Sequence, residues 1–379
     1  MGDRYDVMVV GLGPAGAAAA VELARGGARV LALQRPEPRP KPCGGCLALR
    51  WEQDWSCLGL ELNRLGSGVR HLELCLPGRE PLRRHSRQPV ARLVERNQLN
   101  QLLEEAALQA GVEVVRQAVD NLYQDERGFV VIAGEHNFWG DWLLGADGAR
   151  SLVGRRMRLT PHVKGYLALS EDRPPETGRE WAPGTALLEL GGRLGGYRWA
   201  FFREGELNTG LMATRWPEKG AHLALRQSYA EFLRRHHLGP PGRFRTAVIP
   251  CPAGRLHLVA AGRAAVLGDA AALCDPFLGE GIGQAVHSGL LAARAVLAED
   301  LGAYQRAVER ELLPEHAHAR RLARLIYGLP RVAHALARRR PGSLELGFSL
   351  LRGGLSHRRL WGAVLGRMLG RGVSGPVEG

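Results

Sequence analysis

Residues 5–16 read YDVMVVGLGPAG, a short β-branched run followed by a glycine-rich turn. An alanine-rich helical stretch then continues to Arg25, Gly26-Gly27 ends it, and Ala28–Leu33 forms a second apolar run. A Gly-x-Gly-x-x-Gly motif indicates dinucleotide binding when it lies between a strand and a helix of a βαβ unit of about 30 residues, as it does in this sequence. The opening of the chain therefore predicts a βαβ unit that binds a dinucleotide.

The glycine turn predicts how the phosphates are held. Gly11 allows the tight turn, Gly13 lets the backbone approach a pyrophosphate, and Gly16 lets the helix pack close to the strand. The helix N-terminus adds free amides and a partial positive charge. At the end of the second strand, where an acid usually binds the ribose, the chain has Gln34, followed by Arg35. Gln34 can still accept and donate a hydrogen bond to ribose hydroxyls, and the missing carboxylate leaves NADP open at this position.

Length and composition describe an ordinary globular chain of two or three domains. The 379 residues allow roughly 150 per domain, and 45% hydrophobic with 23% charged residues excludes disorder, collagen-like repeats and coiled coil. Arg4 and Asp6 lie just ahead of the apolar run Val7–Val10, which is too short for a signal peptide or a membrane span. Six cysteines are far fewer than a disulfide scaffold needs, so we expect reduced thiols and a cytoplasmic location.

Two later motifs also follow apolar runs. One is Gly145-Ala146-Asp147-Gly148-Ala149-Arg150-Ser151, and the other is Gly268-Asp269-Ala270-Ala271, with Pro276 and Gly279-Glu280-Gly281-Ile282 after it. Asp269, at the carboxyl end of a strand, can bond a polyol chain. Backbone amides at residues 279–283, where a helix starts, can face an electron-rich ring edge. The three glycine motifs in this order are a highly specific combination.

These motifs resemble the FAD-binding motifs of the aromatic-hydroxylase-like flavoprotein superfamily, and within it the chain is most similar to the geranylgeranyl reductase family. Lys41-Pro42-Cys43-Gly44-Gly45 and Tyr197-Arg198-Trp199-Ala200-Phe201-Phe202 carry the second similarity, which extends from residue 5 to about 300. Arg96 fits a position that the superfamily uses near the flavin diphosphate. The departures are Gln34 for the usual acid, Phe202 where a proline is common, and a second cysteine at Cys46.

The resemblance implies an α/β fold with three parts. An FAD-binding Rossmann-type βαβ domain, glutathione-reductase-like and aromatic-hydroxylase-like, is expected at residues 1–65, 90–158 and 255–300. An inserted antiparallel-sheet substrate domain is expected at 66–89 and 159–254, where short β segments alternate with glycine turns, and a C-terminal helical, Arg-rich region at 301–379. The expected FAD-binding residues are Gly11, Gly13, Pro14, Ala15, Gly16, Gln34, Arg35, Cys43, Gly44, Gly45, Arg96, Asp147, Gly148, Gly268, Asp269, Pro276, Gly279, Gly281 and Ile282.

The implied activity is that of an FAD-dependent oxidoreductase that reduces carbon–carbon double bonds of a prenyl chain by hydride transfer from N5 of reduced flavin. The protein would supply position, dryness and electrostatics. The expected substrate is a prenyl lipid or another apolar small molecule, and no metal is expected. No separate nicotinamide-binding unit is evident, so NAD(P)H and ferredoxin both stay open as electron donor. The alternatives are an FAD-dependent aromatic hydroxylase or monooxygenase, a non-redox lycopene-cyclase-like flavoprotein, and a protein that keeps FAD for structure.

The candidate catalytic residues are Cys43, Cys46, Tyr197 and Trp199. Tyr197, Trp199 and Phe201 alternate along one strand and share a face, which forms either an ordinary core or a wall for an apolar or planar substrate. Cys43 and Cys46 fit a redox dithiol, a packed glycine-rich turn, or half of a zinc site without its second ligand pair. The resemblance places their loop over the flavin ring, where Cys43 would line the substrate channel or donate a proton.

The C-terminal region is strongly basic. From Arg320 to Arg371 there are twelve arginines against one acid, Glu345, which gives a net charge of +11. Apolar residues between Leu322 and Leu336 recur at three- and four-residue spacing, which predicts a basic amphipathic helix. It serves either as a packing helix with a solvated arginine face or as a contact for an anionic surface, either the inner face of the membrane or an acidic electron-donor protein. No nucleic-acid-binding motif is present, so no nucleic acid partner is expected.

Overall fold

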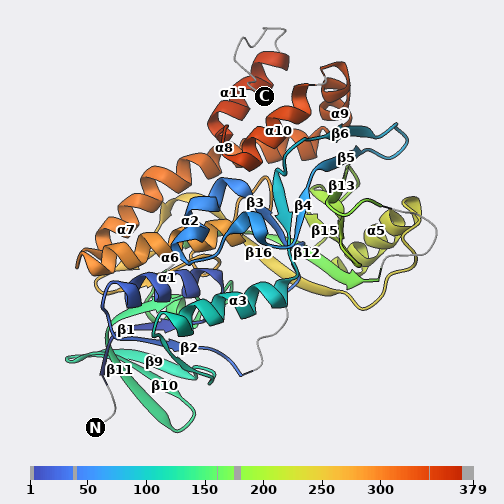
Figure 1. Cartoon of the computed structure of the whole chain (residues 1–379). Helices are drawn as coiled ribbons and strands as arrows, with labels where there is room; N and C mark the ends of the chain where they lie inside the picture. The colour runs from blue at the N-terminus through green and yellow to red at the C-terminus, as the bar shows by residue number, and fades with distance from the viewer. Residues whose placement is uncertain (1–3, 37–40, 160, 175–180, 341, 369–379) are drawn as a thin grey trace.

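The structure is a computed structural model that describes residues 4–36, 41–159, 161–174, 181–340 and 342–368. It contains an eight-stranded, largely parallel sheet at the N-terminal end, a seven-stranded, largely antiparallel sheet beside it, and a group of C-terminal helices packed over the second sheet (Figure 1). The predicted α/β fold is confirmed, with β1–α1–β2 as the predicted βαβ unit. Of the proline-rich loop after Leu33, residues 37–40 lie outside the described residues.

The first sheet has a parallel core in the order β18-β11-β1-β2-β8, and β17 pairs antiparallel with β18 at its edge. Its central strand is buried on both faces, which explains its continuous apolar sequence, because parallel strands are covered on both sides. The glycine turn follows this strand at the carboxyl edge of the sheet. The strands are β1 (Arg4–Val10), β2 (Val30–Leu33), β8 (Glu113–Val115), β11 (His136–Gly145), β17 (Ala260–Ala261) and β18 (Ala264–Val266). In addition, β10 (Gly128–Ala133) pairs antiparallel with β11, and β9 (Asn121–Asp125) pairs antiparallel with β10.

Helix α1 packs beside α3 and α6 over this sheet (Figure 1). Its small residues are fully buried, so that α6 approaches it closely. The helices and short turns of this part are α1 (Pro14–Arg25), η1 (Leu49–Trp51), α2 (Glu52–Cys57), η2 (Leu62–Arg64), α3 (Arg96–Gln109), α4 (Leu152–Arg156), α6 (Ile282–Leu297) and α7 (Leu301–Ala307), which η3 (Val308–Leu312) extends.

The second sheet has seven strands in the order β16-β12-β15-β14-β13-β5-β6, and only β13 and β5 pair in parallel. One face packs against α5 (Ala221–Arg235), where Phe202 stacks on Trp181 with ring centroids 4.4 Å apart. The strands are β5 (His71–Cys75), β6 (Leu82–His85), β12 (Pro161–Arg173), β13 (Thr185–Leu190), β14 (Tyr197–Arg203), β15 (Glu206–Ala213) and β16 (Arg245–His257), and a small third sheet joins β3 (Cys46–Ala48), β7 (Ala91–Leu93) and β4 (Ser67–Val69).

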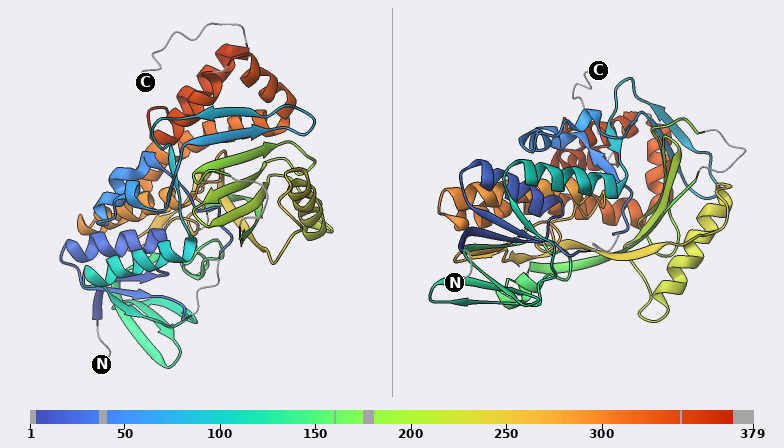
Figure 2. Two further views of the ribbon diagram at one scale, coloured as in Figure 1. Left: turned by 45° about the vertical axis from the view of Figure 1, so that its right-hand side comes forward. Right: turned by 60° about the horizontal axis from the view of Figure 1, so that its bottom comes forward.

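The C-terminal helices cover the other face of the second sheet, beside the β5–β6 hairpin (Figure 2). The single amphipathic helix predicted around residues 322–336 is wrong: α8 ends at Gly328 and α9 begins at Pro330, because proline lacks the amide that would continue the helix. Arg371 lies outside the described residues. In the part of the chain described, no helix has the length and hydropathy to cross a membrane. These helices are α8 (Leu313–Gly328), α9 (Pro330–Arg339), α10 (Gly342–Arg352) and α11 (His357–Met368).

Candidate functional site

One cavity of about 660 Å³ extends from the carboxyl edge of the first sheet to the space between the second sheet and the C-terminal helices. Its volume falls within the range of small-molecule and cofactor sites. We call the part beside the glycine turn, Gln34, Asp269 and residues 275–281 the polar half. The part between strands β5 and β13 and helices α8–α10 is the apolar half.

The glycine turn in the polar half is shaped for close approach by a ligand. A Cβ atom on Gly16 would lie 1.9 Å from the carbonyl oxygen of Gly11, so only glycine fits there. A Cβ atom on Gly13 would meet nothing within 4 Å, although its backbone is in an extended conformation that any residue adopts. The space in front of Gly13 lies at the N-terminus of α1, where free amides favour phosphate. The geometry fits the predicted pyrophosphate of a dinucleotide.

Two side chains border this space with different partners. The side-chain oxygen Oε1 of Gln34 accepts a hydrogen bond from the amide of Leu12 at 2.8 Å, which leaves its NH₂ group for a ribose hydroxyl. The carboxylate of Asp269 forms an ion pair with Lys41. Burial lowers the pKa of Lys41 to about 8, and the nearby Arg96 guanidinium acts in the same direction. Lys41 therefore lies among the predicted FAD-binding residues, although the sequence analysis gave it no role.

Most predicted cofactor-binding residues lie at the cavity wall. Gly16, Gly268 and Pro276 do not, and the first two are contact points between α1, α6 and the sheet rather than ligand contacts. Asp147 lines the cavity, but its carboxylate accepts hydrogen bonds from the Ser151 hydroxyl and the Leu152 amide at the start of α4. Those that line the cavity are Gly11, Gly13, Pro14, Ala15, Gln34, Arg35, Cys43, Gly44, Gly45, Arg96, Asp147, Gly148, Asp269, Gly279, Gly281 and Ile282.

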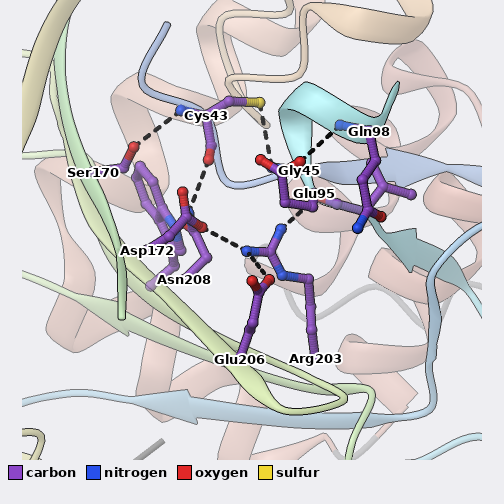
Figure 3. Close-up of polar contacts among 11 residues, drawn as sticks. Cys43, Gly45, Glu95, Gln98, Ser170, Asp172, Arg203, Glu206 and Asn208 are labelled. Carbon is purple, nitrogen blue, oxygen red and sulfur yellow. Dashed lines mark hydrogen bonds and ion pairs between the residues drawn. The ribbon is translucent and has the colours of Figure 1, made fainter. Parts of the chain in front are cut away.

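The loop that carries Cys43 is held by polar groups of the second sheet (Figure 3). The Cys43 amide donates to the Ser170 hydroxyl at 3.0 Å, and its carbonyl accepts from Asn208 Nδ2 at 3.0 Å. Asn208 also donates to Asp172 at 2.8 Å. Buried Arg203 donates to that same carboxylate at 2.5 Å and to the carbonyl of Val94 at 2.6 Å. The backbone of Cys43 is thus fixed, its sulfur accepts hydrogen bonds from the Gly45 amide at 3.3 Å and from Arg96 at 3.9 Å, and the residue lines the cavity.

The aromatic side chains predicted to share one face do line the cavity together. Successive ring centroids along Tyr197, Trp199 and Phe201 are 5.8 and 6.0 Å apart. The Tyr197 hydroxyl donates to the carbonyl of Leu278 at 2.5 Å, and the Trp199 indole donates to Asn208 at 2.7 Å. Their polar atoms therefore hold neighbouring loops, and their catalytic roles stay predictions.

Two titratable groups beside this wall are strongly perturbed by burial. Burial, with smaller contributions from Glu280 and Cys43, raises the pKa of Cys46 to about 12, so this thiol stays protonated at neutral pH. Burial also raises the pKa of Glu280 to about 7, against hydrogen bonds from the Gly283 amide and the Trp51 indole. Both Cys46 and Glu280 line the cavity.

The loop of residues 275–281 is held to the C-terminal helices by a buried ion pair that the sequence analysis missed. Asp275 Oδ2 lies 2.8 Å from His357 Nε2 of α11, and both side chains are 1% exposed. Asp275 Oδ1 accepts from the amides of Phe277 and Leu278 at 2.7 and 3.0 Å. The Tyr327 hydroxyl of α8 donates to the carbonyl of Phe277. Although burial opposes both charges, the ion pair lowers the pKa of Asp275 and raises that of His357 to about 9.

The apolar half is lined almost entirely by hydrocarbon side chains. Strands of the second sheet form one wall and the C-terminal helices form the other, and no motif in the sequence marked either. The wall from the second sheet consists of Leu72, Leu74, Ala186, Leu188, Leu190 and Ile249, with Val69 of β4 beside it, and the wall from the helices of Leu325, Ile326, Leu329, Val332, Ala333, Leu336, Leu344, Leu346 and Phe348.

Comparisons with known proteins show the family to which the chain is related. Residues 4–168 match the FAD binding domain family, which confirms FAD as the cofactor. The chain is 34% identical over 364 residues to the menaquinone reductase of Mycolicibacterium smegmatis, covering 87% of this chain and 86% of that protein. It is 29% identical over 311 residues to the geranylgeranyl diphosphate reductase of Rhodobacter capsulatus, covering 78% and 75%. The fold matches a geranylgeranyl bacteriochlorophyll reductase-like structure from Thermoplasma acidophilum, with a TM-score of 0.73, 22% identity, and coverage of 85% and 88%.

Proposed function

Because the chain belongs to the geranylgeranyl reductase family of FAD-dependent oxidoreductases, we propose that it reduces carbon–carbon double bonds in the prenyl chain of a quinone or another lipid. The observation that carries this proposal is the continuity of the cavity. One end offers the groups expected around a dinucleotide, and the other offers a long hydrocarbon surface without charged side chains. An apolar chain that enters this surface extends toward the ring end of the cofactor site.

The residues of the polar half fit FAD. The open space at Gly13 and the N-terminus of α1 suit the diphosphate, Gln34 borders the ribose position, and Asp269 with Lys41 suits the ribityl side. At the N-terminus of α6, the backbone amides of Glu280 and Gly281 suit the ring edge, whereas the Gly279 amide donates to the carbonyl of Asp275 at 2.9 Å. When bound and reduced, FAD supplies a hydride to one carbon of the double bond, and the neighbouring carbon takes up a proton.

The protein would hold the chain, exclude water and deliver the proton. The apolar walls exclude water from the reacting carbons. Among the groups at the junction of the two halves, the Tyr197 hydroxyl is committed to the carbonyl of Leu278. The thiols of Cys43 and Cys46 line the cavity at the same junction, and we assign proton donation to Cys43, with Cys46 kept in its protonated form by burial. The new C–H bonds use the hydride and this proton, and solvent restores the thiol.

The substrate class rests on the relatives and on the shape of the apolar half. One relative is named for menaquinone and another for geranylgeranyl diphosphate. Among the described residues, no lysine or arginine lines the wall of the apolar half, although arginines gather at its outer end. The apolar half therefore fits the hydrocarbon chain of either substrate and does not by itself select the head group.

The test is a single turnover without oxygen. The FAD-loaded protein is reduced, and its flavin absorbance is followed after mixing with menaquinone, with geranylgeranyl lipids, or with a panel of small aromatic compounds. Reoxidation by the geranylgeranyl lipids, which carry no quinone ring, supports the proposal, whereas reoxidation by menaquinone alone shows only that its ring accepts electrons. Reoxidation that needs oxygen and an aromatic compound would instead assign a hydroxylase, and no reoxidation by any of them would overturn a redox role for the cavity.

A further inference from the structure

The C-terminal helices and the β5–β6 hairpin form one surface around the outer end of the apolar half, which we call the portal face. It comprises residues 79–87 of the hairpin and residues 329–340 and 342–345, which include α9 and the start of α10. The two segments are in contact, because His334 bonds the carbonyl of Glu80 at 3.1 Å and Arg84 lies 3.4 Å from Glu345. Figure 2 shows the hairpin alongside the C-terminal helices.

The apolar half reaches the protein surface at this face. Leu329 and Val332 line the cavity, yet they are 50% and 47% exposed, among the most exposed large apolar side chains of the described residues. Leu329, Val332 and Leu336 follow helical spacing, so one side of α9 both lines the cavity and meets solvent. Exposed apolar side chains that adjoin the mouth of an apolar cavity form a patch of the kind that marks an interaction site.

The portal face is also strongly basic. Its two segments contain eight arginines against two glutamates, a net charge of +6. Both glutamates are already paired, Glu80 with Arg338 at 3.7 Å and Glu345 with Arg84. Arg83 pairs with Glu73 of β5 at 2.7 Å. Within the described residues, no carboxylate pairs with the five remaining arginines of this face, which are exposed: Arg79, Arg87, Arg331, Arg339 and Arg340.

We propose that the portal face docks on an anionic lipid bilayer, with Leu329 and Val332 inserted among the acyl chains and the arginines bound to the headgroups. The proposal rests on the proposed function, because a prenyl chain that passes from the bilayer into the apolar half through this mouth never crosses water. Charge complementarity selects the headgroups, and the apolar mouth selects a bilayer over an acidic protein, which would have no hydrocarbon to offer the two side chains.

The test compares binding of the FAD-loaded protein to vesicles of phosphatidylcholine alone and of phosphatidylcholine with phosphatidylglycerol, by cosedimentation at low salt. We expect binding to the anionic vesicles only. The triple variant Arg338→Gln, Arg339→Gln, Arg340→Gln should bind about 100-fold more weakly, at about fivefold for each basic residue removed. The matched control Arg127→Gln, Arg155→Gln, Arg156→Gln removes the same charge from exposed positions of the first domain and should change binding less than about twofold.

A second pair of variants separates insertion from simple charge attraction. Leu329→Ser with Val332→Ser should weaken binding to anionic vesicles about tenfold with the arginines intact, and high salt should weaken binding of the unmodified protein because it screens the headgroups. Unchanged binding of this double variant would overturn insertion and leave the arginines as a docking site for an acidic protein. Equal losses in the matched control, or no binding at low salt, would overturn the proposal.

A further readout keeps this proposal apart from the proposed function. The triple arginine variant should still reoxidise its flavin with a short-chain prenyl quinone dispersed in detergent, because no residue of the triple lines the cavity. Vesicle binding with no flavin reoxidation by any prenyl compound would overturn the proposed function, and the membrane contact would then have no substrate to deliver. Flavin reoxidation without vesicle binding would overturn the proposal that the portal face docks on a bilayer and would leave the proposed function unaffected.

Discussion

The polar half of the cavity is built from short loops at the ends of strands, where the close approach of the backbone sets the residue type, whereas the apolar half is assembled from the side chains of strands and helices. Gly13 and Gly16 show the first kind of constraint, because a single added carbon would fill a ligand space or clash with the neighbouring turn. Leu72, Leu188 and Leu336 show the second, because any side chain of similar volume and polarity would form the same wall. FAD binding should therefore respond to a single added carbon atom, whereas the apolar half should respond to a change in the average polarity of its wall.

The largest effect expected from this comparison is at Gly13. Gly13→Val should abolish FAD binding and leave the apoprotein folded, because its side chain enters open space in front of α1. Gly16→Val is the contrasting variant: its Cβ would lie 1.9 Å from the carbonyl of Gly11, so the fold itself should be destabilised. Titration of apoprotein with FAD and thermal unfolding measure the two effects. A Gly13→Val protein that binds FAD normally would show that the diphosphate lies elsewhere.

The ion pair of Asp275 with His357 tests whether the C-terminal helices merely cover the cavity or also position the cofactor loop. His357→Ala leaves a buried carboxylate without its cation, which costs about 3–5 kcal/mol of unfolding free energy. We expect a lower melting temperature and weaker FAD binding, because residues 275–281 lose an anchor. The double variant Asp275→Asn, His357→Gln removes both charges and should recover most of the stability. Equal FAD affinity in wild type and His357→Ala would show that α11 covers the cavity without positioning the cofactor loop.

The same pair predicts how stability depends on pH. The folded pKa of His357 is raised to about 9, so its contribution is complete below its unfolded value of about 6.5 and is lost as the pH rises through 9. The pKa of Asp275 is lowered, so its contribution is complete above about 3.9 and is lost at lower pH. The stability difference between wild type and His357→Gln should thus be largest between about pH 4 and 6.5 and shrink toward pH 9. A difference that grows over that upper range would contradict a charged His357.

A smaller effect compares two contacts within the polar half. Asp269→Ala should weaken FAD binding more than Gln34→Ala, because losing a charged hydrogen-bonding group costs about 1.5–3 kcal/mol against about 0.5–1.5 kcal/mol for a neutral one. Gln34 also holds the amide of Leu12, so part of its effect should appear in apoprotein stability. Dissociation constants for FAD in the opposite order would show that the ribityl contact does not involve Asp269.

The smallest effect tests the apolar half alone. Leu188→Asn places an amide of similar size in the hydrocarbon wall, and burying that group against an apolar chain costs about 1–3 kcal/mol. We expect a higher KM for a prenyl substrate with FAD affinity unchanged. Leu188→Met conserves volume and polarity and should behave like wild type. Loss of FAD in Leu188→Asn would mean that the two halves are not separable as described.

The sequence was informative where a backbone conformation demands one residue type. The glycine turn, Gln34 and the motif around Asp269 were predicted because each occupies a fixed place relative to a strand end. The groups that hold Cys43 were not, since Ser170 and Asn208 are ordinary polar residues of strands until the sheet brings them to the loop. Nothing in the sequence pairs Asp275 with His357, because their contact depends on how α11 packs.

In the C-terminal region, the apolar spacing predicts one helix, but a proline within it has the larger effect. Apolar spacing predicted one helix through residues 322–336, but Pro330 starts a second helix after a break at Leu329. A proline inside an otherwise helical pattern ends or kinks the helix at the residue before it. The break turns α9 across the mouth of the cavity, and the walls of the apolar half depend on it. No local pattern reports such a wall, because β5, β13 and α9 contribute only a few residues each.

The most direct test of the central claim is the chemical fate of menaquinone after one anaerobic turnover with the reduced, FAD-loaded protein. A quinone offers two reducible parts, its ring and its chain. If the apolar half carries the chain to the cofactor, mass spectrometry of the re-extracted and air-oxidised product should show a quinone heavier by two hydrogens, with one chain double bond lost. Recovery of unchanged menaquinone after flavin reoxidation would show that only the ring was reduced, and it would contradict the placement of the chain in this cavity.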